Sequence, residues 1–200
     1  MDIYFLGLSA IRLKGKKTAL VIDPFNKEKT GIPFSKTIAD AVLLTSQTVY
    51  TSTEGVEGFR VQASGPGEYE VGGVSIMGIK AGGVTTYYIK MDGVALLHLG
   101  QLKKPLTDSE FDKYPGIDVV FVPVGGGSSI SGKEAAAMIA KLEPKVVVPT
   151  YFKTDAKTKL ELDGIEPFLK EIGKEEIKPQ PKLSLAKEKL PQELEVVWLA

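Results

Sequence analysis

One histidine, His98, and no cysteine limit the chemistry open to this chain of 200 residues. Proteins bind zinc through histidine nitrogen and cysteine sulfur, helped by carboxylate oxygen, with three or four protein ligands per metal. One histidine cannot supply such a site. We therefore expect either that metal chemistry is absent or that the protein uses a metal other than zinc.

His98 lies in the apolar run Leu96-Leu97-His98-Leu99. Buried polar groups are normally hydrogen-bonded, so we interpret it as a structural histidine inside the fold. The alternative is a general acid or base, because histidine titrates near neutral pH. Ser46, His98 and Asp23 also have the residue types of a catalytic triad, but a triad is defined by geometry that the sequence does not fix.

The charge balance argues against several classes of partner. Lysine plus arginine and aspartate plus glutamate number 25 each, so the formal net charge is zero. Such a chain has no overall attraction to nucleic acid or to an anionic membrane. No apolar run approaches the ~20 residues of a membrane span, and Asp2 stands where a signal peptide carries positive charge. We expect a cytoplasmic protein that binds neither nucleic acid nor membrane.

Short apolar runs in the first half of the chain predict strands. They lie at 2–6, 9–13, 17–22, 41–44, 59–63, 68–71, 74–80, 85–90 and 94–99. Gly72-Gly73 and Asp92-Gly93 are typical of two-residue hairpin turns. Residues 25–38 and 46–58 are polar and lack a period, so we expect loops there.

The second half alternates helices and strands. The capping-box patterns Thr107–Glu110 and Ser131–Glu134 each predict a helix start, and a third amphipathic helix is expected around 165–172. Continuous apolar runs at 119–124 and 146–148 predict buried strands, and short strands are expected at 182–186 and 195–199. The pattern favours two sheets with helices outside them, in one domain spanning residues 1–200.

Seven short motifs in order carry a family resemblance. They are Leu6-Gly7-Leu8-Ser9-Ala10, Ile22-Asp23-Pro24-Phe25, Leu43-Leu44-Thr45, Gly65-Pro66-Gly67-Glu68-Tyr69-Glu70, Leu97-His98-Leu99-Gly100-Gln101-Leu102, Val122-Pro123-Val124-Gly125-Gly126-Gly127 and Pro144-Lys145-Val146-Val147-Val148-Pro149. This order resembles the metallo-β-lactamase superfamily, and within it the small predicted zinc-dependent hydrolases. The resemblance covers the full chain and implies an α/β (α+β) fold, the four-layer αββα sandwich.

The resemblance also implies where metal ligands should stand. The family's histidine-rich motif falls on Ser46, Thr48, Tyr50 and Thr51, its bridging aspartate on Gln101 and its last histidine on Thr150. Neutral hydroxyls bind divalent transition metals poorly, and the family's nucleophile is a metal-bound water. The substitutions predict that no metal cofactor is bound, although the family implies zinc.

The same resemblance brings eight residues to one edge of the sandwich. They are Ser46, Thr48, Tyr50, Thr51, His98, Gln101, Thr150 and Tyr151. A neutral pocket of this kind suits a small polar ligand; alternatively, the loop has collapsed and filled the space. The glycine-rich segment Gly125–Ser129 is a second candidate, for an anion held by backbone N–H groups.

Two functions follow from these observations. The first hypothesis is a metal-free, non-catalytic binding or assembly module, a pseudoenzyme that has lost its metal site. The alternative is a metal-dependent hydrolase of the superfamily, acting on lactones or phosphoesters. It would need oxygen ligands such as Glu54, Glu57 or Glu68 for Mg²⁺ or Ca²⁺, or a metal-free nucleophile. Self-association through strand edges or helices is a third hypothesis.

Overall fold

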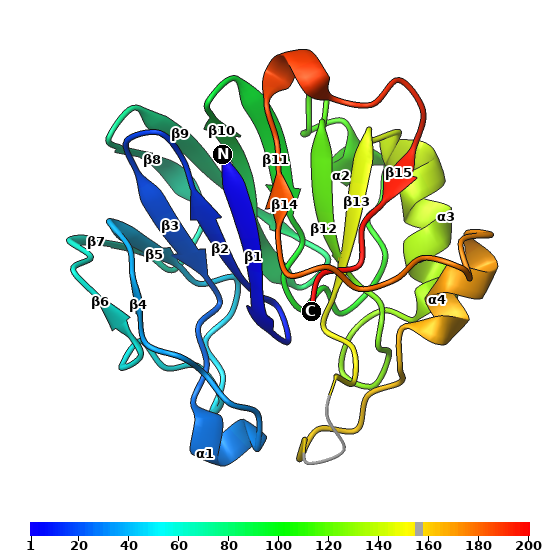
Figure 1. Ribbon diagram of the computed structural model, residues 1–200, viewed down its shortest axis with the longest axis horizontal. Coiled ribbons are helices and arrows are strands. Elements are labelled where there is room, and N and C mark those ends of the chain that lie inside the picture. Colours follow the sequence, from blue (N-terminus) through cyan, green and yellow to red (C-terminus); the bar gives the residue numbers. More distant parts are fainter. Residues whose placement is uncertain (155–157) are drawn as a thin grey trace.

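Two β-sheets pack face to face at the centre of the molecule (Figure 1). The computed structural model describes residues 1–154 and 158–200. Apolar side chains of both sheets meet between them, such as Leu13 and Leu43 from one sheet and Ile89 and Val148 from the other. These positions alternate with residues that face outward, as the period of two residues in a strand requires.

The first sheet has six strands in the order β14-β1-β2-β3-β5-β7. Their bounds are β1 (Asp2–Gly7), β2 (Ala10–Lys14), β3 (Ala19–Ile22), β5 (Ala41–Leu43), β7 (Val61–Ala63) and β14 (Leu183–Ser184). β1, β2 and β3 pair antiparallel, whereas β3, β5 and β7 run parallel. The carboxyl ends of β3 and β5 therefore lie at the same edge of the sheet.

The second sheet has seven strands in the order β15-β13-β12-β11-β10-β9-β8. Their bounds are β8 (Gly67–Val71), β9 (Val74–Ala81), β10 (Val84–Met91), β11 (Val94–His98), β12 (Val119–Pro123), β13 (Val146–Thr150) and β15 (Glu195–Val196). Both predicted hairpins are present: Gly72 and Gly73 join β8 to β9, and Asp92 and Gly93 join β10 to β11, all with positive φ. Strands β11, β12, β13 and β15 run parallel.

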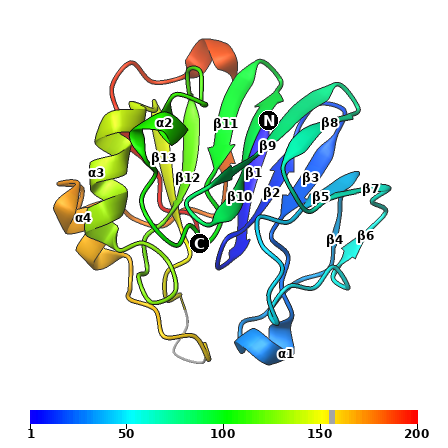
Figure 2. The ribbon, with the colours of Figure 1, turned by 180° about the vertical axis from the view of Figure 1, so that it is seen from behind.

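Helices cover the outer face of the second sheet (Figure 2). They are α2 (Asp108–Phe111), α3 (Gly132–Leu142) and α4 (Glu166–Glu171). Met138 of α3 and Phe168 of α4 belong to the apolar cluster that also contains Val120 and Val147. The capping box predicted at Ser131 is present, because its hydroxyl accepts from the Glu134 amide. The helix predicted after Thr107 ends after one turn, and Tyr114 then turns inward to within 2.7 Å of the Thr86 hydroxyl.

The outer face of the first sheet carries a thinner layer. It contains a separate two-stranded ribbon of β4 (Thr37–Ile38) and β6 (Val56–Glu57), whereas α1 (Lys27–Thr30) lies at the bottom of the molecule in Figure 1, beyond the ends of the strands. The loop predicted at 25–38 therefore holds a helical turn, which forms because the Asn26 side chain accepts from the amides of Glu28 and Lys29. Among the described residues, the longer helices of the αββα arrangement therefore lie on the second sheet.

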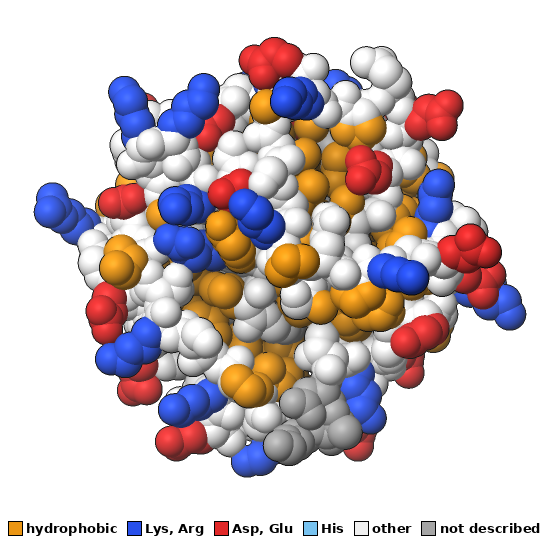
Figure 3. Space-filling model, in the orientation of Figure 1, with side chains coloured by type: hydrophobic (Ala, Val, Ile, Leu, Met, Phe, Trp, Pro, Cys, Tyr) orange, Lys and Arg blue, Asp and Glu red, His pale blue; other side chains and the backbone are white. Residues whose placement is uncertain are grey.

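The C-terminal segment closes one side of the sandwich. β14 pairs with β1, and β15 pairs with β13, so the segment joins the exposed edges of both sheets. Between them lies a short 3₁₀ helix, Lys187–Lys189. Leu183, Val197 and Leu199 enter the apolar cluster between the sheets. Figure 3 shows apolar side chains in the middle of this face, with charged side chains around its margin. In the described part of the chain, no helix has the length and apolar character of a membrane span.

Candidate functional site

A small cavity lies where the carboxyl ends of strands from both sheets meet. Its walls come from the turn after β1, the segment after β3, the loop after β5, the residue Gln101 after β11 and the segment after β13. The lining residues are Leu8, Ser9, Asp23, Pro24, Phe25, Ser46, Tyr50, Thr51, Gln101, Tyr151 and Leu160. We call it the Asp23 cavity. Its volume of about 10 Å³ is close to the room that one water molecule needs.

Asp23 supplies the carboxylate of this cavity. It follows the last residue of β3, and its side chain is held by Thr45 at the end of β5: the Thr45 amide donates to Oδ1 over 2.7 Å and the Thr45 hydroxyl to Oδ2 over 2.6 Å. The side chain of Ser9, which also lines the cavity, acts with Thr45 to lower the pKa of Asp23. Burial nevertheless raises the pKa of Asp23 from 3.8 to about 6, because a carboxylate withdrawn from water is less stable in its charged form.

Several residues that line the Asp23 cavity have strained backbone conformations. The described residues contain five positions other than glycine with φ in the left-handed region, and three of them line the Asp23 cavity: Leu8 (52°), Asp23 (50°) and Tyr151 (50°). Such conformations cost on the order of 1–3 kcal/mol each and concentrate at functional sites. The Tyr151 amide donates to the Leu8 carbonyl over 2.8 Å, so two of the strained residues fix each other.

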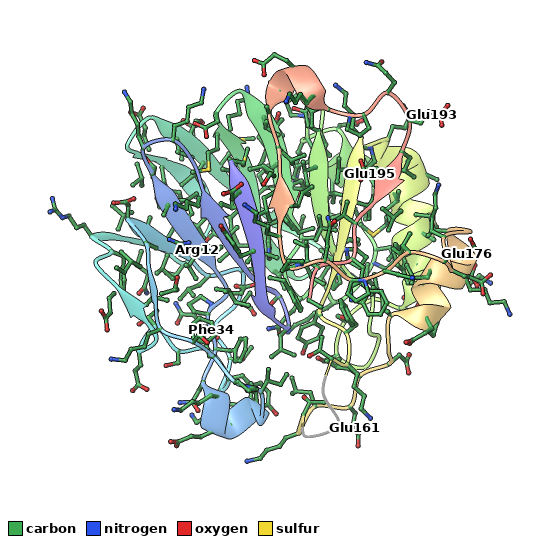
Figure 4. The ribbon with its side chains drawn as sticks, in the orientation of Figure 1. Arg12, Phe34, Glu161, Glu176, Glu193 and Glu195 are labelled. Carbon is green, nitrogen blue, oxygen red and sulfur yellow. The ribbon has the colours of Figure 1, made fainter. Side chains whose placement is uncertain are left out.

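An apolar cluster supports these residues from below. Leu8, Phe25 and Tyr151 pack together, with the half-buried Phe34 and Leu160 at the edge. Phe25 and Phe34 meet edge to face with centroids 5.0 Å apart. Figure 4 shows Phe34 beside α1 and Glu161 in the segment after β13, at the same end of the molecule.

The loop after β5 is closed by its own hydroxyl groups. The Thr48 amide donates to the Thr51 hydroxyl, the Tyr50 amide donates to the Thr48 hydroxyl, and the Thr51 hydroxyl donates to the Ser46 carbonyl. The Asn26 amide then ties the loop to the segment after β3 by donating to the Tyr50 carbonyl over 2.7 Å. Thr48 is exposed, so it shapes the loop and does not line the cavity.

His98 is a buried structural residue. The Gly100 amide donates to its Nδ1 over 3.1 Å, and its Nε2 lies 2.9 Å from the Ser9 carbonyl oxygen. Because a carbonyl can only accept, Nε2 carries the proton and the ring is neutral. Burial lowers the pKa of His98 from 6.5 to about 4. The structural interpretation of His98 is therefore correct, and the triad of Ser46, His98 and Asp23 is not assembled.

Thr150 is also removed from the cavity. Its side chain is fully buried, and its hydroxyl has no hydrogen-bond partner among the described residues. It lies on the same strand face as Val146 and Val148, which fill the space between the sheets. Tyr151, the next residue, turns to the cavity through its positive φ, and its hydroxyl lies 3.1 Å from the Ser128 hydroxyl.

The structure thus brings together five of the eight predicted pocket residues. Those that line the Asp23 cavity are Ser46, Tyr50, Thr51, Gln101 and Tyr151. Thr48, His98 and Thr150 do not line it. The predicted pocket left out Ser9 and Asp23, although both stand in motifs that follow strands β1 and β3. The position of Asp23 could have revealed its role. It directly follows β3, and β3 pairs with β5, which leads into the loop that lines the cavity.

The glycine-rich segment predicted to bind an anion makes backbone contacts within the fold. Within Gly125–Ser129, the Gly125 amide donates to the Tyr151 carbonyl and the Gly126 amide to the Ile130 carbonyl. These amides are not free to hold an anion. A Cβ at Gly125 would collide with the backbone of Tyr151, so this glycine lets the segment after β12 lie directly against the strained residue.

The predicted oxygen ligands do not converge. Glu57 pairs with Lys36 over 3.2 Å on the surface, Glu54 lines a separate groove with Asn26, and Glu68 lies on β8. Within residues 1–154 and 158–200, no group of three or more histidine, aspartate or glutamate side chains is placed to hold a metal ion. The Asp23 cavity offers one carboxylate, the hydroxyl groups of five residues and the Gln101 amide. This donor set does not fit zinc, which takes nitrogen and sulfur ligands.

Comparison with known proteins finds a matching family model and relatives that are named metal-dependent hydrolases. The family model described as "Beta-lactamase superfamily domain" matches residues 2–151. A metal-dependent hydrolase of Symbiobacterium thermophilum is 24% identical, over 86% of this chain and 93% of its own length. One from Pyrococcus abyssi is 27% identical, over 77% of this chain and 85% of its own.

Solved structures show a similar relationship. A proposed zinc-dependent hydrolase of the metallo-β-lactamase superfamily from Thermotoga maritima superposes with a TM-score of 0.81 at 30% identity, covering 100% of this chain and 98% of that one. A metallo hydrolase from Ignicoccus hospitalis superposes with a TM-score of 0.67 at 17% identity, covering 98% and 94%. The second likeness concerns the fold alone. The predicted metallo-β-lactamase fold is confirmed.

These comparisons overturn two predictions from the sequence. The protein was expected to be a non-catalytic module with a lost metal site, and to bind no metal cofactor. Relatives that match over most of the chain are named metal-dependent hydrolases, which favours the alternative hypothesis for both. The error came from treating each exchanged ligand position as lost chemistry, although a site can also be built from residues outside the family's motif.

Proposed function

The chain belongs to the β-lactamase superfamily, and from this we propose that it is a hydrolase whose active site includes the Asp23 cavity as the place of the reacting water. One observation carries the proposal. A buried carboxylate and three residues with strained backbone meet around a cavity of about 10 Å³ at the carboxyl ends of the strands. Strain and a shifted pKa at one place are typical of catalytic sites.

The charge of the lining supports an uncharged substrate. Asp23 is the ionisable acid of the described lining, and no lysine or arginine is part of it. A phosphoester carries negative charge that such a site would repel, whereas arginine, lysine or a metal usually binds it. The hydroxyls of Tyr50 and Tyr151 and the Gln101 amide can donate to a carbonyl oxygen. We therefore favour lactones and other neutral carboxylic esters, a class of small polar ligand.

The relatives and the Asp23 cavity differ on the metal. The names of the relatives support metal dependence, whereas the donor set of the Asp23 cavity does not fit zinc. The described residues assign no ligands to a metal, so the metal enters the experiment as a variable. Location in the cytoplasm and self-association stay predictions, and light scattering would measure the latter.

Purified protein, analysed for bound metals, tests the proposal. Hydrolysis of γ- and δ-lactones, p-nitrophenyl acetate and bis-p-nitrophenyl phosphate is followed with chelator and with added Zn²⁺, Mn²⁺, Mg²⁺ or Ca²⁺. We expect turnover of a lactone or neutral ester at least about tenfold faster than of the phosphodiester, a difference in barrier of about 1.4 kcal/mol. Absence of turnover above the uncatalysed rate under every condition would contradict the proposal.

A further inference from the structure

The Asp23 carboxylate and a space for one water molecule lie side by side. Asp23 lines the cavity and accepts hydrogen bonds from the Thr45 amide and the Thr45 hydroxyl. An ionised carboxylate has about four lone-pair sites. The two hydrogen bonds from Thr45 leave lone pairs of the carboxylate for a water in the cavity.

We propose that Asp23 is the proton acceptor that activates the hydrolytic water, an inference that rests on the proposed hydrolase function. Its carboxylate is fixed from two sides and cannot rotate away without breaking both bonds to Thr45. A base that is held in one orientation by other groups is the arrangement that general base catalysis requires.

The proposed reaction is the hydrolysis of an ester or lactone with Asp23 as the proton acceptor. The water oxygen bonds to the carbonyl carbon of the ester or lactone, and one water proton passes to the Asp23 carboxylate. The bond between that carbon and the leaving oxygen then breaks. Asp23 returns the proton to this oxygen, which yields a carboxylic acid and an alcohol and regenerates the carboxylate.

Other groups near the cavity are less suited to this role. Both ring nitrogens of His98 are engaged with backbone. The titratable groups that face Asp23 are phenols: Tyr50 and Tyr151 from the cavity walls, and Tyr87 from β10 of the facing sheet. Burial raises the pKa of Tyr87 and of Tyr151, so these two stay protonated at neutral pH.

The pKa of Asp23 is suited to a general base. Burial brings its pKa to about 6, and a general base works best when its pKa lies near the working pH. The carboxylate is the active form. Activity should therefore rise through pH 6 and reach a plateau above it.

Asp23→Asn is the decisive variant. Asparagine tolerates the left-handed conformation, and its side chain can still bond to Thr45, so we expect it to fold. Its kcat on the best lactone or ester should fall by about 100-fold or more, the usual contribution of a general base, with a smaller change in KM. The acid limb of the pH profile should vanish. Asp112→Asn, on an exposed carboxylate, serves as the control and should match the wild type.

Thr45→Val adds a readout that a structural role would not move. The variant keeps the shape of the side chain and removes the hydroxyl donor, which lowers the pKa of Asp23. The acid limb should therefore move to higher pH. If the wild type hydrolyses esters but Asp23→Asn keeps its rate, or Thr45→Val leaves the limb in place, the role of Asp23 is overturned and the hydrolase function stands. If the wild type hydrolyses no substrate, the proposed function itself fails.

Discussion

Asp23 and His98 lie close in the fold and titrate in opposite senses. Ser9 is close to both, because its side chain lines the cavity with Asp23 and its carbonyl accepts from His98. Burial raises the pKa of the acid and lowers that of the base. In both cases the buried environment favours the neutral form.

This opposition predicts a specific pH dependence of stability. The pKa of Asp23 is raised from 3.8 to about 6, so its stabilising contribution is present below pH 3.8 and lost as the pH rises through 6. The pKa of His98 is lowered from 6.5 to about 4, so its contribution is present above pH 6.5 and lost as the pH falls through 4. Each is worth on the order of 3 kcal/mol, and the two largely cancel.

Replacing Asp23 should remove its contribution to the pH dependence of stability, so that the opposite contribution of His98 becomes visible. In Asp23→Asn, the free energy of unfolding should rise relative to the wild type by on the order of 3 kcal/mol between pH 4 and pH 6.5. Urea unfolding across that range measures it, and the difference between the two curves cancels all other titrating groups. Parallel curves would show that Asp23 has an ordinary pKa in the folded protein.

At the residue scale, the family resemblance predicted part of the site, and the alternation of side chains along the strands explains which residues it placed wrongly. Ser46, Gln101 and Tyr151 could be predicted because each follows a strand that ends at the same edge. His98 and Thr150 lie within strands, where the period of two turns their side chains into the space between the sheets. Asp23 was left out of the predicted pocket because its bonds to Thr45 come from another strand and leave no mark in the local sequence.

At the scale of elements, local chemistry fixed most boundaries. The hairpins at Gly72-Gly73 and Asp92-Gly93 were predictable because both turn residues must adopt positive φ. Helix α1 was not predicted, since its four residues depend on one side chain, Asn26. Helix α2 and the strands of the C-terminal segment are shorter than expected because tertiary contacts, not local patterns, end them.

The cap of α3 offers a quantitative test at this scale. Ser131 accepts from the Glu134 amide and Glu134 accepts from the Ser131 amide, which satisfies two free donors of the helix. Ser131→Ala should lower the free energy of unfolding by about 1 kcal/mol. Lys133→Ala, an exposed change in the same turn, should stay within about 0.5 kcal/mol. Urea unfolding of both compares them; equal stability of the two variants would show that the cap contributes nothing.

At the scale of the whole molecule, the site depends on both sheets. β3 and β5 of the first sheet hold Asp23 and Thr45, while the segments after β11 and β13 of the second bring Gln101 and Tyr151. The C-terminal segment keeps the sheets together by pairing with β1 and β13. The two-sheet fold could be predicted from the sequence. The family's activity could not, because the ligand positions that define it are occupied by other residues.

The proposed location of the reaction is tested most directly by filling the cavity. Ser46 lines the Asp23 cavity, whereas its neighbour Gln47 is exposed and does not. We predict that Ser46→Phe lowers kcat/KM for the best lactone or ester by at least about tenfold, or 1.4 kcal/mol of barrier, and that Gln47→Phe retains the wild-type value. Both variants are checked for folding by circular dichroism. Wild-type turnover in Ser46→Phe, with its cavity filled, would contradict the account.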